Sequence, residues 1–177
     1  GKRVGDDGGR GHGGSAFVSP DPDLITDGEV IPGGGPTDDG LVVILPLKNW
    51  QPAPLVSLFT CSKDKNKTFT VPPGAFTAQV LAYGASGGDS QSDSKVVGGL
   101  GAAVQGILPV TVGQSLIVKV GCSLYPSGYA LGGDGGGGGS NNIEVGSDGG
   151  DGSAVLTSAG EPLFVAGGGG GAGGRGF

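Results

Sequence analysis

Apolar runs separated by turn residues set the pattern of this chain from residue 41 onward. Residues 41–45 (LVVIL) form a continuous apolar run with β-branched members, which is typical of a strand buried on both faces. Residues 75–83 (AFTAQVLAY) alternate instead, which predicts a strand with one buried face. The apolar face of that strand is expected to carry Phe76, Ala78, Val80 and Ala82.

Shorter segments of the same kind predict further strands. They are residues 55–60, 68–71, one or two strands within 96–112, 116–120, 154–157 and 163–166. Turn sequences separate them: PPG at 72–74, GQS at 113–115 and SAGE at 158–161. The last turn predicts a β-hairpin. No segment repeats its apolar residues with the period of 3.6 that a helix requires, so the predicted fold class is all-β.

Residues 1–40 have a different character and are predicted to be an extended arm, separate from a glycine-rich β domain at 41–177. Four prolines and several glycines separate three short apolar islands at residues 16–18, 24–25 and 30–31. Such a segment cannot bury a core by itself. We therefore expect the arm to become ordered only against its own domain or against a neighbouring copy.

Glycine accounts for 43 of the 177 residues, and much of it recurs at every third position. Four series keep this spacing: Gly5, Gly8, Gly11 and Gly14; Gly132, Gly135 and Gly138; Gly146, Gly149 and Gly152; Gly167, Gly170, Gly173 and Gly176. Three residues per turn is the period of a polyproline II helix, and glycine at each third position lets such helices pack closely. The spacing favours packed polyglycine II helices between the strands over flexible linkers.

The acidic, charge-poor composition argues against several classes of partner. Charged residues make up 15% of the chain and the formal net charge is −6, whereas phosphate binding needs clustered Lys and Arg. We therefore expect no nucleic-acid partner. No apolar run reaches the roughly 18 residues that cross a bilayer, so no membrane span is expected. Because the chain begins with Gly1, a mature form whose leader has been removed is expected.

The two cysteines and one sequon indicate an extracellular or cell-surface protein. Cys61 and Cys122 fit a single disulfide in an oxidising compartment, with two separate buried thiols as the alternative. The glycine-rich, charge-poor composition favours the disulfide. Asn66, followed by Lys67 and Thr68, is an acceptor for an N-linked glycan.

Candidate catalytic and metal-binding residues are few. His12 is the only histidine, so a His-based triad lacks its base, and neither cysteine has a candidate base nearby in the sequence. We therefore expect no enzymatic activity and no cofactor. Asp134, Asp148 and Asp151 lie among glycines and carry the oxygen ligands that Ca²⁺ prefers. Because Asp and Gly are also ordinary turn partners, solvated turn residues are favoured over a metal site.

The second part of the chain resembles a known family. Five sequence motifs occur in a fixed order: TFTVPPG, AYGASGG, ILPVTVGQSLIVKVG, GGDGGGGG and SAVLTSAGEPLFVAGGGGGAGG. This series resembles the glycine-rich domain of the anaplastic lymphoma kinase and leukocyte tyrosine kinase receptors, which also occurs in bacterial surface proteins and phage tail proteins. The resemblance covers residues 55–177. It implies a jelly-roll β-sandwich with inserted polyglycine II helices and a non-catalytic role, although the kinase and most of the receptors' cysteines are missing.

Two functions follow from these observations. The first is an extracellular structural subunit that assembles head to tail with copies of itself, as a filament, by inserting its arm or a strand into a neighbour. The residues expected to carry this assembly are Leu41, Val42, Val43, Ile44, Leu45, Phe17 and Val18. The alternative is a ligand-binding or adhesin module with a glycine-rich binding surface. Glycans are a further possible partner.

Overall fold

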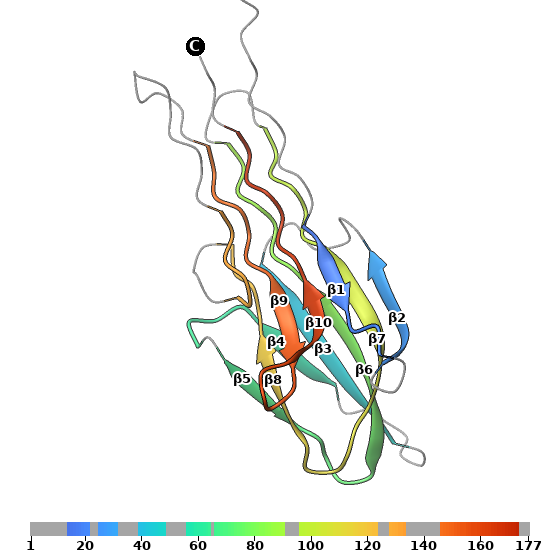
Figure 1. Cartoon of the computed structure of the whole chain (residues 1–177). Helices are drawn as coiled ribbons and strands as arrows, with labels where there is room; N and C mark the ends of the chain where they lie inside the picture. The colour runs from blue at the N-terminus through green and yellow to red at the C-terminus, as the bar shows by residue number, and fades with distance from the viewer. Residues whose placement is uncertain are drawn as a thin grey trace, which may run out of the picture.

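A computed structural model of the chain describes residues 14–21, 25–31, 39–48, 56–64, 66–90, 96–123, 128–133 and 146–173. The described residues form two antiparallel sheets of five strands each and no helix (Figure 1). The all-β class predicted from the alternation of apolar residues is therefore confirmed, and the arrangement is consistent with a β-sandwich.

Each sheet combines strands from distant parts of the chain. The strands of sheet A are, in spatial order, β1 (Ala16–Val18), β10 (Pro162–Ala166), β9 (Ser153–Leu156), β8 (Ser115–Lys119) and β5 (Lys67–Thr70). Those of sheet B are β2 (Thr26–Ile31), β7 (Ala103–Pro109), β6 (Ala75–Tyr83), β3 (Leu41–Lys48) and β4 (Ser57–Thr60). The edges are therefore β1 and β5 in sheet A, and β2 and β4 in sheet B.

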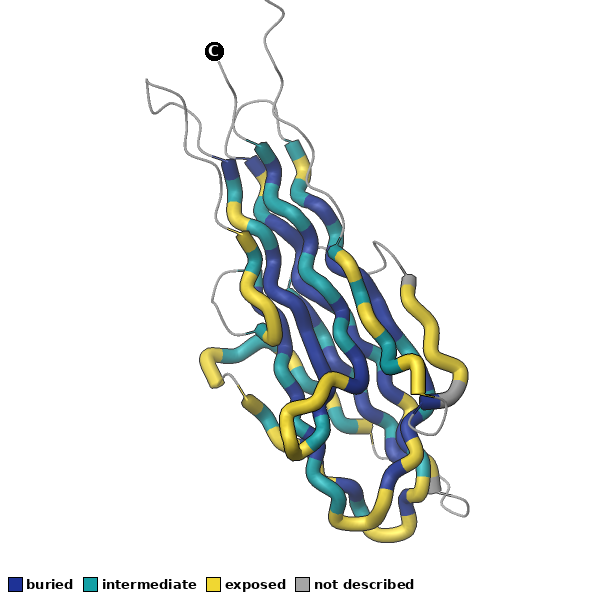
Figure 2. Tube along the Cα trace, in the orientation of Figure 1, coloured by how far each residue is buried: buried dark blue, intermediate teal, exposed yellow. Residues whose placement is uncertain are grey.

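The hydrophobic core takes its side chains from both sheets. Val42, Ile44 and Val80 of sheet B are fully buried, as are Leu116 and Phe164 of sheet A. In β3 and β8 alternate residues are buried, because successive side chains of a strand point to opposite faces. Figure 2 shows these buried stretches continuing along the sheets.

The predicted hairpin near the end of the chain is confirmed. Strand β9 pairs with β10 in antiparallel register, and the turn between them is closed by hydrogen bonds between Thr157 and Glu161 (2.8 Å) and between Gly160 and Thr157 (2.9 Å). Gly160 has a φ of 88°, in the left-handed region that glycine adopts without strain. The turn chemistry was therefore readable from the residues themselves.

Strand β6 begins differently from its expected pattern. Ala78, Val80 and Ala82 are buried as predicted, but Phe76 is 62% exposed, so its expected place on the apolar face is wrong. The pairing of β3 with β6 shifts register between Leu47 and Lys48, so that no residue of β3 is opposite Phe76. This irregularity reverses the alternation at the start of β6.

The exposure of Phe76 makes a simple prediction. Replacing Phe76 by Ala is expected to change the free energy of unfolding by less than about 0.5 kcal/mol, as for other surface positions. Val80→Ala, on the same strand but fully buried, is expected to cost about 2 kcal/mol from lost burial and the cavity left behind. Urea denaturation of the two variants measures both values, and an equal loss would contradict the placement of Phe76.

Residues 96–112 and the predicted arm at residues 1–40 each differ from what the sequence predicts. Within the predicted strand region 96–112, only Ala103–Pro109 is a strand, and residues 96–102 run on as extended backbone without sheet pairing. In the predicted arm, β1 pairs with β10 and β2 pairs with β7 of the same chain. The arm thus supplies one edge strand to each sheet.

Candidate functional site

Four extended segments leave one end of the two sheets, and a fifth segment lies beside them (Figure 1). They are residues 84–90, 96–102, 128–133, 146–152 and 167–173, and together they are called the glycine array here. Four of them are continuous with strands, since residue 84 follows β6, residue 102 precedes β7, residue 152 precedes β9 and residue 167 follows β10. The sheets therefore fix where these four segments enter the array.

Hydrogen bonds within the array recur at every third residue. Gly169 and Ala172 donate their N–H groups to the carbonyls of Ala85 and Gly88, at 2.8 and 3.0 Å. Donors three residues apart also connect the remaining bonded pairs of segments. In each case the named residues donate their N–H groups to carbonyls of the range that follows: Gly84, Gly87 and Ser90 to 96–102; Ala85 and Gly88 to 146–152; Gly149 and Gly152 to 128–133; Ser147 and Gly150 to 167–173; Gly99 and Ala102 to 167–173. Within a segment, the residues that donate to one neighbour are therefore three apart, and the residues that donate to another neighbour form a separate series with the same spacing.

The segment 167–173 lies at the centre of this arrangement. It donates to 84–90 and accepts from both 96–102 and 146–152, with N···O distances between 2.7 and 3.0 Å. Its burial has the same period, because Gly169 and Ala172 are buried while the residues between them are half-buried. Residues 167–173 are called the central segment below.

Close backbone contact explains why glycine is needed. A Cβ on Gly84 or Gly87 would overlap the carbonyls of Gly167 and Gly170 in the central segment. The array also contains positions with room, because a Cβ on Gly133 would meet no atom of the described residues within 4 Å. Glycine in the array is thus a packing requirement at some positions and not at others.

One open groove of about 500 Å³ lies along the described array. Most of its lining residues are glycines. The lining comprises Ser15, residues 130–133, Ser147, Gly149, Gly150, Gly152 and the central segment. Asp151 fixes one side of the groove, because its carboxylate accepts hydrogen bonds from the N–H groups of Gly132 (2.8 Å) and Gly128 (3.3 Å) and is itself buried. Sequence reasoning treated Asp151 only as a turn residue or calcium ligand.

Several amides of the central segment, which lines this groove, have no acceptor among the described residues. Within the described part of the chain, the N–H groups of Gly168, Gly170 and Gly171 donate no hydrogen bond, and all three residues line the groove. An unpaired peptide N–H binds a carbonyl oxygen well. The groove is therefore suited to an extended backbone that has acceptors at short, regular intervals.

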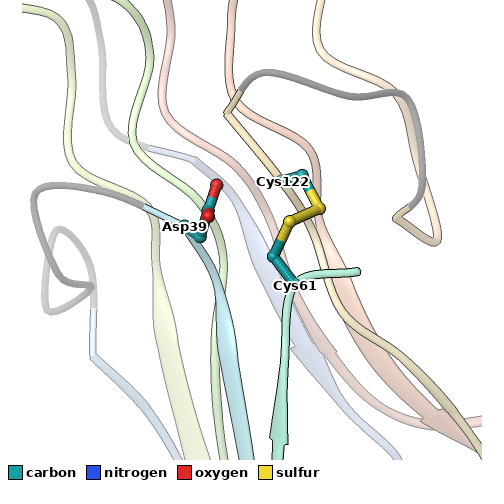
Figure 3. Close-up of side chains that lie close together, drawn as sticks. All are labelled: Asp39, Cys61 and Cys122. Carbon is teal, nitrogen blue, oxygen red and sulfur yellow. A yellow bond between two sulfur atoms is a disulfide. The ribbon is translucent and has the colours of Figure 1, made fainter. Parts of the chain in front are cut away.

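The predicted disulfide is present between Cys61 and Cys122 (Figure 3). It connects the residue after β4 of sheet B to the chain just after β8 of sheet A, with a Cα–Cα distance of 5.3 Å. Asp39 lies beside it and accepts hydrogen bonds at 2.8 Å from the N–H and hydroxyl of Ser123. The disulfide thus closes the end of the sandwich next to the array.

The metal and catalytic candidates are not gathered into a site by the described residues. The group of potential ligands there is Asp39, Cys61 and Cys122, within 4.8 Å of one another, and both sulfurs are in the disulfide. Asp148 is exposed, and Asp151 bonds the amides of the array. His12 and Asp134 lie outside the described residues.

The residues predicted to carry assembly fall on two strands. Leu41, Val43 and Leu45 of β3 are half-buried, and Val42 and Ile44 belong to the core. Phe17 and Val18 belong to β1 at the edge of sheet A, where Phe17 is 42% exposed. Asn66, the predicted glycan acceptor, is exposed just before β5.

Comparison with protein-family models, with curated proteins and with solved structures finds no match for this chain. In the part of the chain that the structure describes, no helix has the length and apolar character needed to cross a membrane.

Proposed function

We propose that the chain is a non-catalytic, extracellular structural subunit that assembles into a filament by exchanging its N-terminal strands between copies. The observation that carries the proposal is the position of β1 and β2. Both precede residue 40, and they form one edge of sheet A and one edge of sheet B. Because they also contact each other, they are a single unit that can leave both sheets together.

The contacts of these strands favour exchange. Strand β1 has three residues and pairs only with β10, and β2 pairs only with β7. The connection to β3 has the sequence PGGGPTDDG at residues 32–40, which is typical of a hinge. Exchange of an identical element replaces each pairing by the same pairing in the neighbour, so it costs little free energy. A head-to-tail exchange leaves one unit open at each end, which extends the assembly as a filament.

Strand β3 is less suited to this role. It lies between β4 and β6 of the same chain, so both of its edges are already paired. Removing it would break pairings on two sides and expose Val42 and Ile44 of the core. The proposal therefore takes Phe17 and Val18 of β1 as the exchanged residues. Residues 41–45 stay in sheet B of their own subunit.

The finer features of the fold are part of the same proposal. We propose that the sandwich is of jelly-roll type and that the array consists of polyglycine II helices, as in the receptor and microbial domains that this sequence resembles. The three-residue interval of the hydrogen bonds supports the helices, because that interval equals the period of polyproline II backbone. The disulfide supports an extracellular location, and the exposure of Asn66 supports glycosylation there.

Engineered cysteines test the exchange directly. Phe17 and Val165 are opposite each other in the pairing of β1 with β10. In the variant Phe17→Cys/Val165→Cys, oxidation of assembled protein is expected to give a ladder of covalent multimers on a non-reducing gel. The control Val43→Cys/Leu58→Cys joins β3 to β4 and is expected to give only monomers.

Two further outcomes complete the test. Deletion of residues 1–40 is expected to abolish filaments seen by electron microscopy, because the exchanged unit is gone. Filaments that persist after the deletion, or cysteine cross-links confined to single chains in monomeric protein, would overturn assembly by exchange. The second result would instead support a monomeric binding module that uses the groove.

A further inference from the structure

The central segment, which lines the groove, has N–H groups at a three-residue interval that donate to no described residue. Gly168 and Gly171 are three residues apart, and neither N–H donates a hydrogen bond within the described residues. All other interfaces of the central segment use the same interval, with Gly169 and Ala172 bonding one neighbour and the carbonyls of Gly167 and Gly170 another. These two N–H groups could therefore donate to the carbonyls of one more segment with the same three-residue spacing.

The described end of the arm lies beside the central segment. Strands β1 and β10 pair Ala16 with Ala166 and Phe17 with Val165. Continued by two residues, this antiparallel register brings Gly14 opposite Gly168. A Cβ on Gly14 would overlap the carbonyl of Gly168, so the two backbones are already in close contact. Ser15 lines the groove itself, and the N–H of Gly14 donates to the carbonyl of Leu100 (3.3 Å), so the described end of the arm lies where the central segment, residues 96–102 and the groove meet.

The sequence before Gly14 keeps the spacing that this contact demands. Gly11, Gly8 and Gly5 follow at intervals of three. The positions between these glycines carry the side chains of the segment, which include Asp6, Asp7, Arg10 and His12. In a helix of three residues per turn, one face is then glycine alone and the other two faces carry the side chains. Gly11 precedes Gly14 by the same three residues by which Gly171 follows Gly168.

We propose that this groove is the docking site for residues 5–13, which add a sixth glycine segment to the array and accept hydrogen bonds from Gly168 and Gly171. The segment belongs to the chain whose β1 lies on β10. In the proposed filament that chain is the neighbouring copy, and only this attribution rests on the proposed function. Side-chain ligands gain little from a lining that is mostly glycine, whereas an extended glycine segment suits both its shape and its donors.

Paired glycine substitutions in the full chain test the proposal. Gly8→Ala/Gly11→Ala puts methyl groups on the face in phase with Gly14. Gly9→Ala/Gly13→Ala adds the same two methyl groups on the other faces. Hydrogen exchange of a peptide that includes residues 167–173 is measured by mass spectrometry. The first variant is expected to lose the protection of two amides, exchanging about tenfold faster or more, whereas the second keeps the wild-type rates.

The outcomes separate the docking site from the assembly. Equal rates in both variants, or unprotected amides in the wild-type chain, would overturn the docking site even if filaments form. A phase-dependent loss of protection in strictly monomeric protein supports the docking site and overturns the assembly. A phase-dependent loss in filaments that also give the cysteine ladder supports both.

Discussion

Replacing Cys61 and Cys122 together by alanine is expected to lower the free energy of unfolding by about 4 kcal/mol. The bond closes a loop with a sequence separation of 61, and in the chain-entropy model a loop of that length restricts the unfolded chain by this amount. For a chain of this size the midpoint of thermal unfolding should fall by roughly 8–16 °C. Because the bond joins the end of β4 to the chain after β8, the two sheets should separate most easily where the array begins.

Reductant provides the matched control. Wild-type protein scanned with a thiol reductant is expected to unfold at the midpoint of the double variant, and the double variant should not respond to reductant. Calorimetry of the four samples measures all the midpoints. A double variant as stable as wild type would mean that the close packing of the sheets, with Val42 and Phe164 both fully buried, already holds this end together.

Much of the fold could be predicted because each strand carries its own pattern. The alternation in β6 and the SAGE turn between β9 and β10 are local features, so the sequence alone located them. The exposure of Phe76 could not be predicted, because it depends on a register shift against β3, a strand more than 25 residues away in sequence. Strand pairing across such distances leaves no mark in a local pattern.

In the candidate site, too, local features could be predicted from the sequence and contacts between distant segments could not. The glycine spacing predicted close packing of extended segments, and the structure has hydrogen bonds at that interval. The glycine spacing did not predict which segments are neighbours, because glycine carries no side chain that could distinguish one neighbour from another. The strands decide this, since β6, β7, β9 and β10 deliver their segments to fixed places. Asp151 was underestimated for a related reason, since its role depends on the amides of Gly128 and Gly132.

The second large effect is expected inside the array, at Gly169. Its Cβ would overlap the carbonyl of Gly99, and its N–H already bonds Ala85. Neither neighbour can yield by a side-chain rotation, because both contacts are with backbone. Gly169→Ala is therefore expected to cost about 3 kcal/mol, at the upper end of overpacking penalties, and to lower the midpoint of thermal unfolding by roughly 6–12 °C.

Gly133→Ala is the matched control, because a methyl group at Gly133 meets no atom within 4 Å in the described part of the chain. A glycine with open space and an ordinary φ is expected to tolerate alanine, with a gain of about 0.4–1 kcal/mol from the restricted unfolded chain. Calorimetry of the two variants gives the comparison, and equal midpoints would show that the array yields to a methyl group as a loop does. A large loss at Gly169 alone would show instead that backbone contact, and not glycine flexibility, accounts for the glycine at the centre of the array.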